Sequence, residues 1–116
     1  MPTYAEPEDG VRIRPAALRQ WTAALVARVG TPTDIAEDVA EILVAADCRG
    51  IASHGTARLP NYVALIEARA MEAAARPVVE REHGGVTLLD ACNGWGQHAG
   101  RVAVDRAIER ARQVGV

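Results

Sequence analysis

The stretch TPTDIAEDVAEILVAADCRG, residues 31–50, constrains the fold most, because it carries the clearest helical pattern in the chain. Four apolar residues recur three or four positions apart: Ile35, Val39, Ile42 and Ala46. This spacing puts them on one face of a helix. Threonine, proline and aspartate at the start and glycine at the end are typical helix boundaries. The rest of the chain must therefore supply elements that cover one long apolar helix face.

Two more helices are predicted beside this one. The first begins near Pro15 and ends at Gly30. Its apolar positions, at helical spacing, are Leu18, Trp21, Leu25 and Val29. The second covers about residues 56–70, which places Pro60 in the first turn, where proline is tolerated.

The second half of the chain predicts two strands and a helix. ARPVVERE (75–82) and GGVTLLDACN (84–93) are short β-branched runs that form two strands, with a hairpin as one arrangement. Residues 96–116 predict an amphipathic helix whose apolar stripe carries Val104, Ile108 and Ala111.

We therefore expect an α/β fold, more narrowly an α+β segment, with three helices, two short strands and one further helix. Residues 1–14 are predicted to form a tail and residues 15–116 a single unit. Two strands do not make a stable sheet alone. If the chain continues, we expect another strand within a few residues of Gly115.

Composition and charge argue against several functional classes. A formal net charge of -2 gives no electrostatic reason to expect a nucleic-acid partner. Cys48 and Cys92 lie far apart, which indicates neither a zinc site nor a disulfide framework. The N-terminus lacks the pattern of a secretory signal, and no apolar stretch reaches the roughly 18 residues of a membrane span. These features predict a cytoplasmic protein without a membrane partner.

The segment RGIASHGTARLP, residues 49–60, is the first candidate site. If a helix begins between Ser53 and Thr56, His54 and Arg58 project from the same face of its first turn. A guanidinium fork binds a carboxylate in two places, and an imidazolium gives a proton to an oxygen that gains charge. The spacing also fits a structural alternative, in which Ser53 caps the helix and the other two residues are ordinary surface residues.

A second candidate is GWGQHAG, residues 94–100, which follows a predicted strand and precedes a helix. It resembles a dinucleotide fingerprint, but its spacing is G-x-G-x-x-x-G and not G-x-G-x-x-G. A turn followed by a helix start is the favoured interpretation, and it covers His98 as well.

Acidic residues of the 31–50 helix form a third candidate. They are Glu37, Asp38, Glu41 and Asp47. Carboxylates can bind a metal, but no histidine accompanies these at ligand spacing, so a hydrated helix face is favoured. His83 is predicted to belong to a turn.

The segment ADCRGIASHGTARLPNYV, residues 46–63, resembles the N-terminal signature of the malate/L-lactate dehydrogenase family, approximately A-D-x-R-G-x-x-S-H-G-x-x-R-L-P-x-Y. Every fixed position is met. The resemblance continues through LLDACNGWGQHAG, which is similar to the family's D-G-x-x-G-x-G-Q, and into the final helix. This family is unrelated to the Rossmann-type lactate and malate dehydrogenases.

The resemblance implies an NAD- or NADP-dependent oxidoreductase that interconverts 2-oxo acids, or cyclic imines, with hydroxy or amino acids. It implies that His54 is the proton donor, that Ser53 assists His54, and that Arg58 holds the substrate carboxylate. It assigns no metal, and no cofactor-binding residue is identified.

Family members continue beyond this point with a strand, an N-S-x-H-x-G segment and most of the cofactor-binding region. The resemblance therefore implies a truncated chain or one piece of a split enzyme, lacking the rest of the family's sheet. Such a chain is expected to be inactive alone and to work as a homo-oligomer or with a complementing C-terminal fragment. The alternative is a non-catalytic helical interaction module that associates with full-length relatives.

Overall fold

The fold is seen in a computed structural model that describes residues 10–115. In chain order the elements are α1 (Pro15–Arg28), α2 (Thr33–Cys48), the 3₁₀ turns η1 (Ala52–His54) and η2 (Thr56–Arg58), α3 (Leu59–Glu67), β1 (Val78–His83), β2 (Val86–Asp90) and α4 (Gly96–Val114). The predicted fold class and element order are confirmed. Most of the predicted tail, residues 1–9, and Val116 lie outside the described residues.

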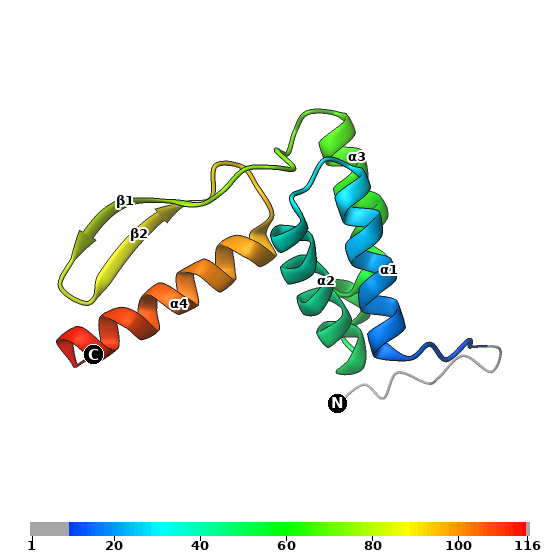
Figure 1. Cartoon of the computed structure of the whole chain (residues 1–116), viewed down its shortest axis with the longest axis horizontal. Helices are drawn as coiled ribbons and strands as arrows, with labels where there is room; N and C mark the ends of the chain where they lie inside the picture. The colour runs from blue at the N-terminus through cyan, green and yellow to red at the C-terminus, as the bar shows by residue number, and fades with distance from the viewer. Residues whose placement is uncertain (1–9, 116) are drawn as a thin grey trace.

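The elements form two arms that meet at the start of α4. Figure 1 shows α1, α2 and α3 packed together, whereas the hairpin and α4 extend away from them side by side. The radius of gyration is 16.4 Å, compared with about 13 Å for a compact domain of this length. The chain is therefore more extended than a closed domain of its size. No described helix has the length and apolar character needed to cross a membrane.

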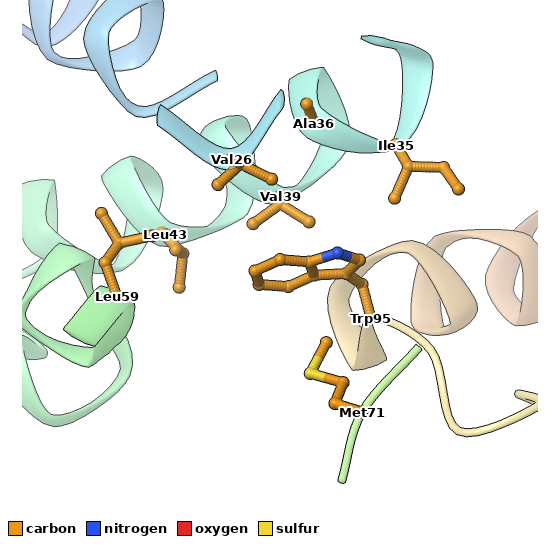
Figure 2. Close-up of a cluster of buried hydrophobic side chains, with 8 residues drawn as sticks. All are labelled: Val26, Ile35, Ala36, Val39, Leu43, Leu59, Met71 and Trp95. Carbon is orange, nitrogen blue, oxygen red and sulfur yellow. The ribbon is translucent and has the colours of Figure 1, made fainter. Parts of the chain in front are cut away.

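The core lies where the two arms meet, and Trp95 is its largest fully buried side chain. The residues of the core cluster come from α1, α2, α3 and the segments around them: Val26, Ile35, Ala36, Val39, Leu43, Leu59, Met71 and Trp95. Figure 2 shows the indole ring between Val39 and Met71. Its Nε1 donates a hydrogen bond of 3.0 Å to Thr31 Oγ1, so the one polar atom of the ring is also satisfied.

The two strands form an antiparallel hairpin, as one of the predicted arrangements had it. The register pairs Val78 with Asp90 and His83 with Val86, and it shifts between Val79 and Arg81. The prediction that His83 lies in a turn is wrong: it is the last residue of β1, because the turn starts only at Gly84.

Parts of two predicted apolar faces are exposed in this structure, although Leu25 and Val29 of the first face pack against the core. Trp21 is 57% exposed, because α1 turns Thr22 and Val26 toward the core instead. Val104 and Ile108 are 58% and 45% exposed. The reason is that α4 packs on α2 through its first turns, where His98 is buried, while its later turns lie beside the hairpin.

A surface ion pair fixes the segment between the arms to the start of α2. Arg76 donates two hydrogen bonds of 2.8 and 2.9 Å to the carboxylate of Asp34. The Arg76 guanidinium lowers the pKa of Asp34 from 3.8 to about 2. Because this pKa is lowered on folding, the pair stabilises the fold above pH 3.8 and ceases to do so as the pH falls through about 2.

We predict that Arg76→Gln returns the pKa of Asp34 from about 2 toward 3.8. The reason is that the substitution removes the bidentate bond and the positive charge. Carbon NMR titration of the Asp34 carboxyl group measures this shift. Arg28→Gln, at the exposed end of α1, is the control and should leave that pKa unchanged. An equal Asp34 pKa in the native protein and Arg76→Gln would contradict the pairing.

Candidate active site

The end of α2 aims the chain into the RGIASHGTARLP segment. Gly50 has a φ of +73°, which is the left-handed conformation that glycine adopts without strain. Its N–H bonds to the Asp47 carbonyl, and the Ile51 N–H bonds to the Ala46 carbonyl, both at 2.9 Å. This pair of bonds is a Schellman motif, which ends the helix and turns the chain sharply.

The Asp47 carboxylate then holds the following loop in place. Its Oδ2 accepts hydrogen bonds from the Thr56 backbone N–H at 3.0 Å and from the Thr56 hydroxyl at 2.7 Å. Gly55 is buried against it, and a Cβ at that position would lie 1.6 Å from Asp47 Oδ1. The loop can therefore approach α2 this closely only because residue 55 has no side chain.

Between Gly50 and Leu59 the chain forms two 3₁₀ turns, not the first turn of a helix. Gly55 is extended, with φ -95° and ψ -161°, and separates η1 from η2. The expectation that His54 and Arg58 share the first turn of α3 is thus wrong, as is the alternative that Ser53 caps that helix. The helix begins at Leu59 without a side-chain cap. Pro60 lies in its first turn, as predicted.

Ser53 and His54 are in direct contact. Ser53 Oγ lies 2.9 Å from His54 Nδ1, and both side chains are exposed. When the hydroxyl donates its hydrogen to Nδ1, a neutral imidazole carries its own proton on Nε2. The contact can thus fix which ring nitrogen faces solvent as a donor.

Ser53, His54 and Arg58 line one cleft of about 920 Å³. The other lining residues are Ile42, Ala46, Arg49, Ile51, Tyr62, Gly96 and Gln97. None of them is acidic, and Arg58 makes no ion pair with any described residue. The cleft therefore presents the guanidinium groups of Arg49 and Arg58 and the imidazole of His54 without a compensating carboxylate, which favours an anionic ligand.

The start of α4 supplies another part of the lining of this cleft. Gln97 Nε2 donates a hydrogen bond of 3.0 Å to the Tyr62 hydroxyl. The rings of Tyr62 and Trp95 are 5.2 Å apart at an angle of 55°, a tilted aromatic pair. Burial of Trp95 thus places its neighbours Gly96 and Gln97 beside the residues of the SHGTAR loop.

Most of the other candidate residues have structural contacts, whereas Glu37 is exposed. His98 Nδ1 lies 2.7 Å from Asp38 Oδ2, and Arg101 bridges Asp38 and Glu41. With Asp47 bound to Thr56, the acidic residues of α2 are not simply a hydrated face. Among residues 10–115 no group of three or more histidine, cysteine and acidic residues could hold a metal ion.

GWGQHAG forms a turn and a helix start, as favoured. It follows β2, whose neighbour in the described chain is the antiparallel strand β1. A dinucleotide fingerprint requires a parallel βαβ unit. Its second residue, Trp95, is buried in the core and so unavailable to a nucleotide.

Comparison with known proteins places this chain in a family. Residues 13–116 match the family model described as malate/L-lactate dehydrogenase. The chain belongs to the malate/L-lactate dehydrogenase family. It is 38% identical over 109 residues to a malate dehydrogenase of Pyrococcus abyssi and 36% identical over 105 residues to an L-lactate dehydrogenase of Cupriavidus necator. These alignments cover 94% and 90% of this chain but 30% of each relative.

Solved structures of family members have the same arrangement of elements. The malate dehydrogenase of Pyrococcus horikoshii matches with a TM-score of 0.91 and 31% identity, over 97% of this chain and 32% of that chain. The Δ1-piperideine-2-carboxylate reductase of Pseudomonas syringae matches with a TM-score of 0.81 and 29% identity. The chain thus spans about a third of the length of these family members.

Reasoning from sequence missed the residues that build the cleft around the family motif. Asp47 was grouped with a hydrated face, and Tyr62, Trp95 and Gln97 were given no role. The signal available was the position of Trp95 between a predicted strand and the predicted helix that contains Gln97, in a chain with only two tryptophans and no phenylalanine.

We predict that Gly55→Ala destabilises the chain by about 2 kcal/mol, because the new methyl group displaces Asp47 from Thr56 and breaks charge-assisted hydrogen bonds. Urea unfolding followed by circular dichroism measures the change. Gly100→Ala is the matched control, since within the described chain no atom outside the local helix backbone lies within 4 Å of the added Cβ on α4. It should stabilise the chain by about 0.5–1 kcal/mol. Equal unfolding midpoints for the two variants would refute the stabilising role of the hydrogen bonds between Asp47 and Thr56.

Proposed function

We propose that this chain provides the substrate-binding and proton-donating part of an NAD- or NADP-dependent oxidoreductase that reduces a 2-oxo acid, or a related cyclic imine, to a hydroxy or amino acid. The observation that carries the proposal is the common cleft of Ser53, His54 and Arg58, which contains no acidic residue. Family relatives include proteins named as L-lactate, malate and L-sulfolactate dehydrogenases and as a reductase of cyclic imine carboxylates.

Each residue has a role that its chemistry supports. The Arg58 guanidinium binds the substrate carboxylate through two parallel hydrogen bonds. His54 donates a proton to the oxygen, or imine nitrogen, at C2 as that atom gains negative charge. Ser53 orients the ring through its 2.9 Å contact with Nδ1. The nicotinamide cofactor supplies the hydride that C2 receives. GWGQHAG does not form a Rossmann-type dinucleotide fingerprint, and we assign no described residue to the cofactor.

The proposal is tested in a chimera in which this chain replaces the matched third of the Pyrococcus horikoshii malate dehydrogenase, which has the same arrangement of elements over 97% of this chain. We predict that His54→Ala lowers kcat/KM for 2-oxo acid reduction by about 10²–10⁴-fold, because the general acid is removed. Arg58→Lys should lower kcat/KM by about 10–100-fold, mainly through KM, because lysine cannot form the bidentate bond. The assay follows oxidation of NADH and NADPH with a panel of 2-oxo acids.

Exposed residues of the same types provide the controls. His83→Ala at the end of β1 and Arg28→Ala at the end of α1 lie outside the cleft and should leave kcat/KM unchanged. If His54→Ala retains full activity in a folded chimera, the proposed role of His54 is wrong. We expect the 116 residues alone to show no turnover, because no described wall would hold the cofactor against the substrate.

Exposed apolar side chains favour a second function, as an interaction module that joins other family polypeptides. Val86 and Leu88 of the hairpin are 71% and 51% exposed, and Val104 of α4 is 58% exposed. Apolar groups exposed this way favour association. A pull-down with a full-length family enzyme tests this function, and absence of a complex would remove it. The homo-oligomeric state, a complementing fragment and the cytoplasmic location remain predictions.

A further inference from the structure

The hydrogen bond between Gln97 and Tyr62 joins α4 to α3 in the wall of the cleft. Gln97 is the second residue of α4, and its Nε2 donates to the Tyr62 hydroxyl oxygen at 3.0 Å. Both residues line the cleft that also contains His54 and Arg58. The bond therefore joins two elements at the place where we propose that the substrate binds.

The direction of this bond determines what Tyr62 can do. An amide nitrogen only donates, so the tyrosine oxygen is the acceptor, and the hydroxyl hydrogen is not used in this bond. No other hydrogen bond involves the Tyr62 hydroxyl within the described chain. The hydrogen is thus available to an acceptor atom in the cleft.

Both partners are held by the core. The Tyr62 ring packs against Trp95, which is 1% exposed, and Trp95 immediately precedes the first residues of α4. The Gln97 Oε1 atom is buried and has no partner among the described residues. The bond to Tyr62 is consequently the one that fixes the orientation of the Gln97 amide.

We propose that Gln97 is a positioning residue, which holds the Tyr62 oxygen as an acceptor so that the Tyr62 hydroxyl hydrogen points to a substrate oxygen. This inference rests on the proposed function of the cleft. It adds Tyr62 as a donor to the 2-oxo acid, beside the guanidinium of Arg58 and the imidazole of His54. A carboxylate or carbonyl oxygen is the acceptor that such a donor takes.

The test is an NMR titration of the isotope-labelled chain with oxamate, which has a carboxylate beside a carbonyl. Tyr62→Phe removes the donor and should weaken oxamate binding about 10-fold, the usual effect of losing a hydrogen bond to a charged group. Gln97→Glu can only accept, so it turns the Tyr62 hydrogen away from the cleft and should weaken binding equally. Gln97→Met leaves the hydroxyl unrestrained and should weaken binding only about 2–3-fold.

The double variant separates positioning from charge repulsion and from simple destabilisation. If Gln97 acts through Tyr62, Gln97→Glu has no further effect on oxamate affinity in the Tyr62→Phe background. A full additional loss in that background would overturn the inference, since the new charge would then act directly on oxamate. Thermal unfolding of each variant accompanies the titration, and a merely structural role would instead lower affinity and unfolding temperature together in Gln97→Met.

A ligand-free measurement keeps this inference distinct from the proposed function. The side-chain amide signal of Gln97 should change between the native chain and Tyr62→Phe, because its acceptor is lost. An unchanged signal would show that the bond does not form and would overturn the inference even if oxamate binds. If oxamate does not bind, or if Arg58→Ala leaves its affinity unchanged, the proposed function fails. The Gln97 amide signal still tests the bond between Gln97 and Tyr62 in that case.

Discussion

Burial of the Trp95 indole is the interaction on which the rest of this structure depends. The ring occupies the junction of the two arms, in contact with a cluster drawn from α1, α2, α3 and the segment around Met71. In a chain without phenylalanine, no other side chain among residues 10–115 supplies comparable volume there. Removing such a ring typically costs about 3–5 kcal/mol. The same burial sets where α4 begins, and hence where Gln97 meets Tyr62.

The residues of the family motif have two roles. Some determine the conformation of the loop between α2 and α3, and others are exposed on that loop to the cleft. Gly50 reverses the chain, Asp47 holds Thr56, and Gly55 permits the close approach between them. Ser53, His54 and Arg58 remain exposed on the resulting 3₁₀ turns. Short turns held by the hydrogen bonds between the Asp47 carboxylate and Thr56 are suited to a binding site. They fix the positions of side chains without burying those that would bind a ligand.

The sequence allowed prediction of the features that depend on local pattern. Helical periodicity, glycine boundaries and β-branched runs predicted the order of elements and the hairpin, and the motif predicted residues that line one cleft. Features set by contacts distant in sequence were missed. The burial of Trp95 depends on Thr31 and Met71, and α3 starts later than expected because Gly55 interrupts the helix. Periodicity also placed Trp21 and Val104 on apolar faces without showing that no described element covers them.

Fluorescence of Trp95 tests the central claim, that this ring joins the arms. Trp21→Phe leaves Trp95 as the sole tryptophan. The account predicts blue-shifted emission that iodide quenches weakly, and a red shift in urea that coincides with the loss of helical circular dichroism. Emission typical of an exposed tryptophan, or a red shift completed while the helices remain intact, would contradict it.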